Sequence, residues 1–92
     1  MALYGKNFAL TFSELLIKSG VSCYRIAEYS HLDEAYLSRL KNGQKTNPTP
    51  ETMVRICLAL AHCSTKLGIN DFEKLFKAGG RSLFPKEKFS TV

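Results

Sequence analysis

Apolar residues recur at helical spacing along nearly the whole of this 92-residue chain. Apolar side chains three and four positions apart fall on one face of a helix, whereas a half-buried strand alternates apolar and polar residues, and no convincing alternation is found. The pattern predicts five short helices, over residues 7–18, 22–29 and 33–42, from residue 49 onward, and over residues 70–78. Short helices with short connections predict a compact all-α fold.

The expected helix ends carry side chains that suit them. Four residues can act as N-caps, accepting a hydrogen bond from a backbone N–H group of the first turn, and these are Ser22, Asp33, Thr49 and Asn70. Pro50 suits the first turn of the fourth helix. Glycine suits the left-handed backbone that follows many helices, and it is found at Gly20, Gly43, Gly79 and Gly80.

The fourth helix has two apolar sides. Its inner side is expected to consist of Met53, Ile56, Cys57 and Leu60. A second strip at i, i+4 and i+7 spacing consists of Val54, Leu58 and Ala61. This strip either packs beneath the last helix, which carries Phe72, Leu75 and Phe76, or forms a contact between two copies of the chain. Burial is the simpler expectation.

Residues 22–43 form the most informative segment. Two short helices are joined there by about three residues, which makes them cross steeply. Ala27 supplies the small side chain that a close crossing needs. Leu37 and Leu40 turn inward, so the third helix presents outward a polar face made of Glu34, Ala35, Ser38 and Arg39. A protruding polar helix beside a basic loop is the shape that enters a DNA major groove.

This combination resembles the lambda-repressor-like (Cro/repressor-type, XRE) helix-turn-helix family over about residues 12–60. The matching elements are the Leu15 helix, Ser22 before Ile26-Ala27-Glu28, Leu32 in the turn, Leu37-Ser38-Arg39-Leu40 before Asn42-Gly43, and then Pro48, Glu51-Thr52, Ile56 and Leu60. The resemblance implies a compact five-helix DNA-binding domain with the helix-turn-helix at its second and third helices. We expect this domain to cover residues 1–80, with a basic tail at 81–92.

The resemblance also implies a DNA-binding site. Residues 33–42 would form the recognition helix, with base edges read by Glu34, Ala35, Ser38 and Arg39. Arg39 can donate to O6 and N7 of guanine, Glu34 can accept from N4 of cytosine, and Ala35 can contact a thymine methyl group. Phosphate contacts position a protein on DNA, and they are expected from Ser22, Cys23, Tyr36, Lys41, Asn42, Gln44, Lys45 and Thr46.

Several of these residues have structural alternatives. Arg39 can instead form a surface ion pair with Glu28. Glu34 can simply favour the positive end of the helix dipole. Tyr36, and Tyr24 as a further candidate for a phosphate contact, can be partly buried with only the hydroxyl in solvent.

The implied function is that of a sequence-specific regulator that binds double-stranded DNA as a homodimer, and a repressor in preference to an activator. Three departures from the family pattern bear on it: His31 stands where glycine is usual, Cys23 where glutamine is common, and Asp33 and Glu34 place two acids at the tip of the recognition helix. The acids and Cys23 favour an alternative, a protein-interaction module or antitoxin-type regulator on the same fold with weak or no DNA binding. A protein partner would be bound through the tail.

Net charge agrees with a polyanionic ligand but does not require one. The formal charge is +5. Residues 35–50 hold three basic side chains and no acid, and residues 74–92 hold five basic side chains and one acid. Two positive regions attract nucleic acid, although an ordinary solvated surface explains them equally well.

Other classes of protein are not expected. The three cysteines, Cys23, Cys57 and Cys63, lack zinc-site spacing, and the chain shows neither a Ser-His-Asp or Cys-His catalytic arrangement nor a Gly-rich phosphate loop. No apolar run approaches the roughly 20 residues that span a bilayer, and the start lacks the features of a signal peptide. We therefore expect a cytoplasmic protein that is not an enzyme and needs no metal or cofactor.

Overall fold

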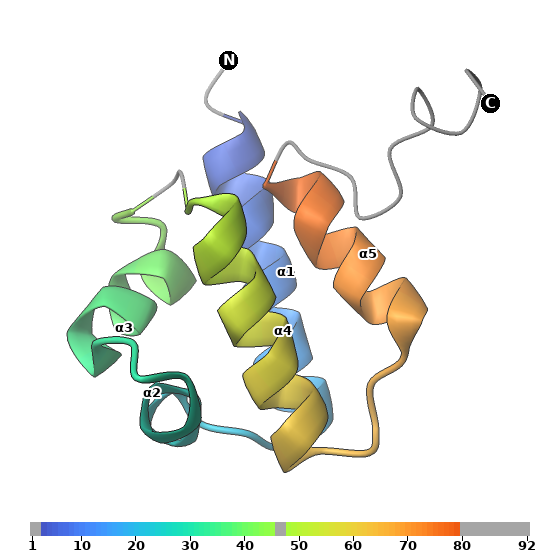
Figure 1. The fold of residues 1–92 in the computed structure, drawn as a ribbon. Coiled ribbons are helices and arrows are strands. Elements are labelled where there is room, and N and C mark those ends of the chain that lie inside the picture. Colours follow the sequence, from blue (N-terminus) through green and yellow to red (C-terminus); the bar gives the residue numbers. More distant parts are fainter. Residues whose placement is uncertain (1–2, 46–47, 80–92) are drawn as a thin grey trace, which may run out of the picture.

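The computed structural model describes residues 3–45 and 48–79, and within them the chain is helical with short connections and no strand. The helices are α1 (Leu3–Ser19), α2 (Cys23–Ser30), α3 (Glu34–Asn42), α4 (Pro50–Cys63) and α5 (Ile69–Ala78). Figure 1 shows α4 at the front, with α5 on one side of it and α2 and α3 on the other. Helix α1 packs against α3 and α5, and α2 packs against α3 and α4. The predicted all-α fold is confirmed.

The five helices contribute to a single hydrophobic core. Its fully buried side chains include Phe8, Phe12, Ile26, Leu37, Leu40, Met53, Ile56, Leu60 and Leu75. These positions are the apolar faces that helical spacing singles out, because a helix in a small domain is held mainly by burial of one face. Cys57 and Phe72 are only half-buried and pack at the edge of the core.

Most of the predicted helix caps are confirmed. Ser22 Oγ accepts from the Arg25 N–H at 3.2 Å, and Asp33 Oδ2 accepts from the Tyr36 N–H at the same distance. Thr49 Oγ1 accepts from the N–H of Thr52 at 3.1 Å, with Pro50 in the first turn of α4. These bonds satisfy backbone donors that have no partner within the helix.

The starts of the first and last helices differ from the prediction. Helix α1 begins at Leu3 and not at residue 7, since the preceding residues contain no proline that would stop it. Helix α5 begins at Ile69, with Gly68 as its N-cap, so Asn70 lies inside the helix. The cause is Asp71, whose Oδ2 accepts from the Gly68 N–H at 2.9 Å and fixes the N-cap two residues earlier than expected.

The second apolar strip of α4 is not buried beneath α5, so that expectation was wrong. The exposed fraction is 43% for Val54 and 57% for Leu58, and Ala61 is exposed as well. Helix α5 packs mainly against α1, and it lies beside this face of α4 without covering it. The alternative, a contact between two copies, stays a prediction.

No helix among the described residues is long and apolar enough to cross a membrane. The basic tail predicted at residues 81–92 lies outside the described part of the chain.

Candidate nucleic-acid interface

The orientation of α3 is set by two leucines. Leu37 and Leu40 are fully buried in the core, so the opposite face of the helix is turned to solvent. Glu34, Ala35 and Arg39 are exposed on that face. Ser38 is half-buried at its edge. The structure therefore places the four predicted base-reading residues on one outward surface.

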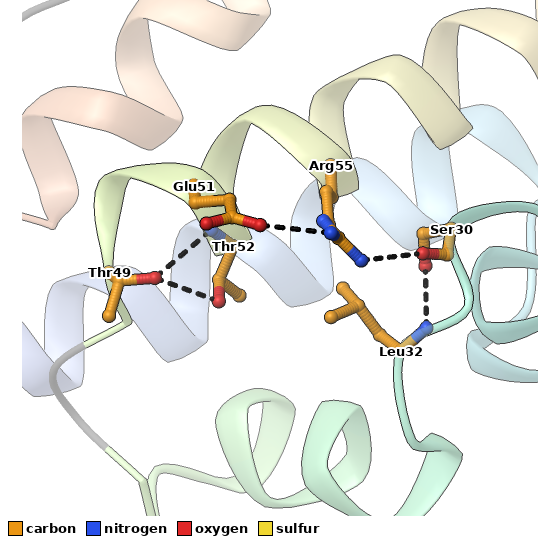
Figure 2. Close-up of polar contacts among 6 residues, drawn as sticks. All are labelled: Ser30, Leu32, Thr49, Glu51, Thr52 and Arg55. Atoms are coloured by element: carbon orange, nitrogen blue, oxygen red, sulfur yellow. Dashed lines mark hydrogen bonds and ion pairs between the residues drawn. The ribbon is translucent and has the colours of Figure 1, made fainter.

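The turn between α2 and α3 is held by a polar network that the sequence analysis missed (Figure 2). Ser30 Oγ donates to the Ile26 carbonyl at 2.6 Å and accepts from the Leu32 N–H at 3.3 Å. Arg55 of α4 donates through Nη1 to the Ser30 carbonyl at 3.3 Å and pairs through Nη2 with Glu51 at 2.9 Å. Helix α4 thereby fixes the turn that sets the angle of α3.

Only part of this network has a signal in the sequence. Glu51 and Arg55 are four residues apart on one helix, a spacing typical of an ion pair. The bond from Arg55 to Ser30 spans 25 residues and depends on how α2 packs against α4. Local patterns cannot reveal a contact of this kind.

His31 ends α2 in the left-handed conformation expected of a glycine at this turn. Its φ is 61°, and its N–H donates to the Ala27 carbonyl at 2.9 Å. Histidine is among the residues that tolerate this region. His31 therefore serves as a turn residue here and adopts the backbone conformation that glycine usually supplies.

An open depression joins the start of α2 to the outward face of α3. Ser22, Cys23 and Tyr24 line it from α2 and its N-cap. Glu34, Ser38 and Lys41 line it from α3, and the end of α1 closes the third side. The structure thus brings predicted base-reading and phosphate-binding residues to one surface. Ile17 of α1, which is 83% exposed, also borders it and was not predicted.

Cys23 adds no negative charge to this depression. Burial raises the pKa of its thiol above the ordinary value of 9.0, Lys41 lowers it, and Glu34 raises it further. The thiol is therefore protonated at neutral pH, and a phosphate approaching the start of α2 meets no thiolate.

The loop after α3 is folded back onto the end of that helix. Gly43 has a φ of 82°, and the N–H groups of Gln44 and Lys45 donate to the Arg39 carbonyl at 2.8 and 3.2 Å. The predicted phosphate contacts of this region are exposed, and they are Lys41, Asn42, Gln44 and Lys45. Thr46, which was predicted with them, lies outside the described residues.

The structure tests the structural alternatives that the sequence offered for Arg39, Tyr24 and Tyr36. Arg39 and Glu28, both of them described residues, do not form an ion pair with each other. Glu28 interacts instead with the Tyr24 hydroxyl and thereby raises the pKa of that phenol. Tyr24 is exposed, whereas Tyr36 is half-buried and packs against the core, as its alternative predicted.

A comparison with models of protein families matches residues 13–67 to the helix-turn-helix family. This stretch is more than half of the chain and runs from α1 to the loop before α5. The chain belongs to the lambda-repressor-like helix-turn-helix family. Searches of curated proteins and of solved structures found no match.

The match to the helix-turn-helix family identifies the kind of domain in which the depression lies. The matched residues include α2, α3 and the loop after α3, so the surface formed by α3, the start of α2 and this loop belongs to a DNA-binding domain of the transcription-regulator type.

Within residues 3–45 and 48–79, no three His, Cys, Asp or Glu side chains come together as a metal site.

Proposed function

We propose that the protein is a sequence-specific transcriptional repressor that binds double-stranded DNA as a homodimer. The observation that carries the proposal is the polar outward face of α3, held by two buried leucines and followed directly by an exposed basic loop. An exposed helix of this kind fits the width of the major groove, where each base pair presents a distinct pattern of donors and acceptors.

The base-reading roles follow from side-chain chemistry. Arg39 is exposed and has no ion-pair partner among the described residues, so its guanidinium is available to donate to O6 and N7 of a guanine. Glu34 would accept from cytosine N4, and Ala35 would contact a thymine methyl group. Ser38, at the edge of the same face, would bond either to a base or to a neighbouring phosphate.

Phosphate contacts would come from both sides of α3. On one side, Ser22 and Cys23 at the start of α2 line the depression, and the unpaired N–H groups and positive dipole end of a helix start would attract a phosphate there. On the other side, Lys41 and Lys45 with the side chains of Asn42 and Gln44 lie along the exposed loop. Two anchors on either side of the recognition helix would fix its position in the groove.

Repression is the simplest outcome for such a domain. A protein that occupies a promoter excludes other proteins by volume alone, whereas activation requires a further contact that recruits them. DNA as the proposed ligand agrees with the cytoplasmic location that the sequence leads us to expect.

A protein-interaction or antitoxin-type role on the same fold is the second candidate. Glu34 favours it, because an exposed acid at the tip of α3 repels nearby phosphates. Asp33 adds a second negative charge beside it, because its carboxylate stays ionised while it serves as the N-cap of α3.

Selection from a pool of random-sequence duplexes tests the proposal. The protein should retain a palindromic sequence, and its affinity should fall steeply as salt rises, because phosphate contacts release counterions. Retention without sequence preference would contradict specific recognition. No retention even at low salt would favour the protein-interaction role.

A further inference from the structure

The peptide group between Ser30 and His31 is bonded at both ends. The His31 N–H donates to the Ala27 carbonyl at 2.9 Å, and the Ser30 carbonyl accepts from Nη1 of Arg55 at 3.3 Å. Because a peptide group is planar, these two bonds together fix its orientation. That orientation decides the direction in which the chain leaves α2, since His31 and Leu32 lead directly into the N-cap of α3.

We propose that Arg55 is a positioning residue for base reading by α3. Arg55 belongs to α4 and does not line the depression that carries base-reading residues. It acts through the Ser30 carbonyl, which fixes the turn and with it the tilt of α3. The part of the proposal that concerns bases rests on the proposed function, whereas the state of the turn is measured without DNA.

The turn needs a restraint from outside because its backbone conformation is unfavourable. His31 has a φ of 61°, in a region that residues other than glycine rarely adopt. Such a conformation persists where the surrounding structure over-determines it. Ser30 Oγ supplies one restraint within the turn, through the Leu32 N–H. Arg55 supplies another from a helix that packs against α2.

The guanidinium group suits this role because it is planar and presents its donors in fixed directions. Nη2 of Arg55 pairs with Glu51 at 2.9 Å, while Nη1 reaches the Ser30 carbonyl (Figure 2). Glu51 lies four residues before Arg55 on α4, which is the favourable order for an acid and a base. An exposed ion pair adds little to stability by itself. The pair with Glu51 instead holds the Arg55 side chain toward the turn.

The tilt of α3 matters more for base reading than for phosphate binding. Helix α3 has 9 residues, which makes it about 14 Å long. A rotation of roughly 5° at the turn therefore moves the far end of α3 by about 1 Å. Specific recognition needs its groups within about 0.5 Å of their productive positions, whereas a flexible lysine reaches a phosphate without that precision. Loss of the Arg55 bond should therefore reduce discrimination between sequences and leave non-specific affinity nearly unchanged.

Arg55→Lys tests the state of the turn, with the protein alone. Lysine keeps the positive charge, but its ammonium group on a shorter chain cannot hold both partners in this geometry. Amide hydrogen exchange should become faster by roughly tenfold at His31 and Leu32 and stay unchanged in α1. Arg25→Lys is the matched control, since Arg25 is an exposed arginine of α2 that lines a different depression. It should exchange like the wild type.

The same variants test base reading on DNA, after circular dichroism has shown that they are folded. The affinity for the selected site is divided by the affinity for a scrambled duplex. In Arg55→Lys this ratio should fall by roughly tenfold, with affinity for the scrambled duplex within about twofold of the wild type. Arg25→Lys should keep both values. An arginine that merely bound a phosphate would be replaced by lysine without loss of the ratio.

Three results would overturn the positioning role of Arg55. These are unchanged exchange at His31 and Leu32 in Arg55→Lys, a ratio of affinities equal to that of the wild type, and an equal loss of affinity for both duplexes. A wild type that bound no DNA would refute the proposed function instead. Exchange at the turn would then decide by itself whether Arg55 positions α3, so the two proposals fail separately.

Discussion

At the scale of single residues, His31 holds a left-handed backbone conformation in the helix-turn-helix that side chains other than glycine rarely adopt. A φ of 61° places its Cβ close to a backbone carbonyl oxygen, which costs roughly 1–2 kcal/mol in residues other than glycine. Glycine removes this cost but adds freedom to the unfolded chain. His31→Gly should therefore raise the free energy of unfolding by up to about 1 kcal/mol, as measured by urea denaturation.

The control for this prediction is His31→Ala, which removes the exposed imidazole but keeps the Cβ. It should leave stability unchanged or lower it. Equal gains from alanine and glycine would show that the imidazole, and not the backbone conformation, is the unfavourable feature.

Residue-level patterns located most of the candidate interface because its main determinants are local. Leu37 and Leu40 are three residues apart, and that spacing fixes which face of α3 is outward. Ser30 and Arg55 could not be found in this way. The spacing of Arg55 and Glu51 indicates an ion pair within α4 but not the bond to Ser30, which exists only because α2 and α4 pack together.

At the scale of helices, Asp71 joins α5 to α1. It accepts from the Gly68 N–H at the start of α5 and pairs with Lys18 at 3.1 Å. Both interactions favour the ionised carboxylate, with the Gly68 bond the larger cause, and they hold the Asp71 pKa below its ordinary value of 3.8. In the unfolded chain Asp71 loses these partners. The folded state therefore binds a proton at Asp71 less tightly than the unfolded state does.

The pH dependence of stability follows from this lowered pKa of Asp71. The contribution of Asp71 to the free energy of unfolding is complete above the unfolded-state pKa of about 4. It is lost as pH falls through the lower pKa of the folded state. Asp71→Asn keeps an oxygen that can cap Gly68 but removes the charge. It should cost about 1 kcal/mol at pH 7, measured by urea denaturation. The difference from the wild type should shrink near pH 3, and a constant difference would contradict the account.

Helix boundaries were predictable where a side chain determined them. Ser22, Asp33 and Thr49 cap their helices through their own oxygens, which the sequence displays. The start of α5 was placed wrongly because Gly68 has no side chain, and the bond comes back to it from Asp71. The exposed strip of α4 was misjudged for a different reason. Its burial depends on the position of α5, which tertiary packing on α1 determines.

At the scale of the whole molecule, the net charge of +5 should strengthen DNA binding mainly through the basic side chains that lie next to the candidate interface. Lys45 is exposed in the loop after α3, and its removal should weaken binding to all duplexes by a similar factor. The salt dependence of affinity should also fall by about one counterion. Fluorescence anisotropy of a labelled duplex across a salt series measures both quantities.

Lys77→Ala is the matched control for Lys45→Ala. Lys77 is exposed in the last turn of α5, outside the candidate interface, and its loss should change the salt slope much less. If both substitutions weakened binding equally, charge would act without regard to position. The loop after α3 would then not be a phosphate contact.

Base reading by α3 is tested by measuring binding to single-base variants of the selected site. Arg39→Ala should lose discrimination at one guanine position in each half-site, by about 1–3 kcal/mol, because two donors to O6 and N7 are removed. Arg25→Ala substitutes another exposed arginine, on the surface shared with His62 and Cys63, and should keep the wild-type preference at every position. A uniform loss of affinity in Arg39→Ala, or no loss, would contradict base reading by α3.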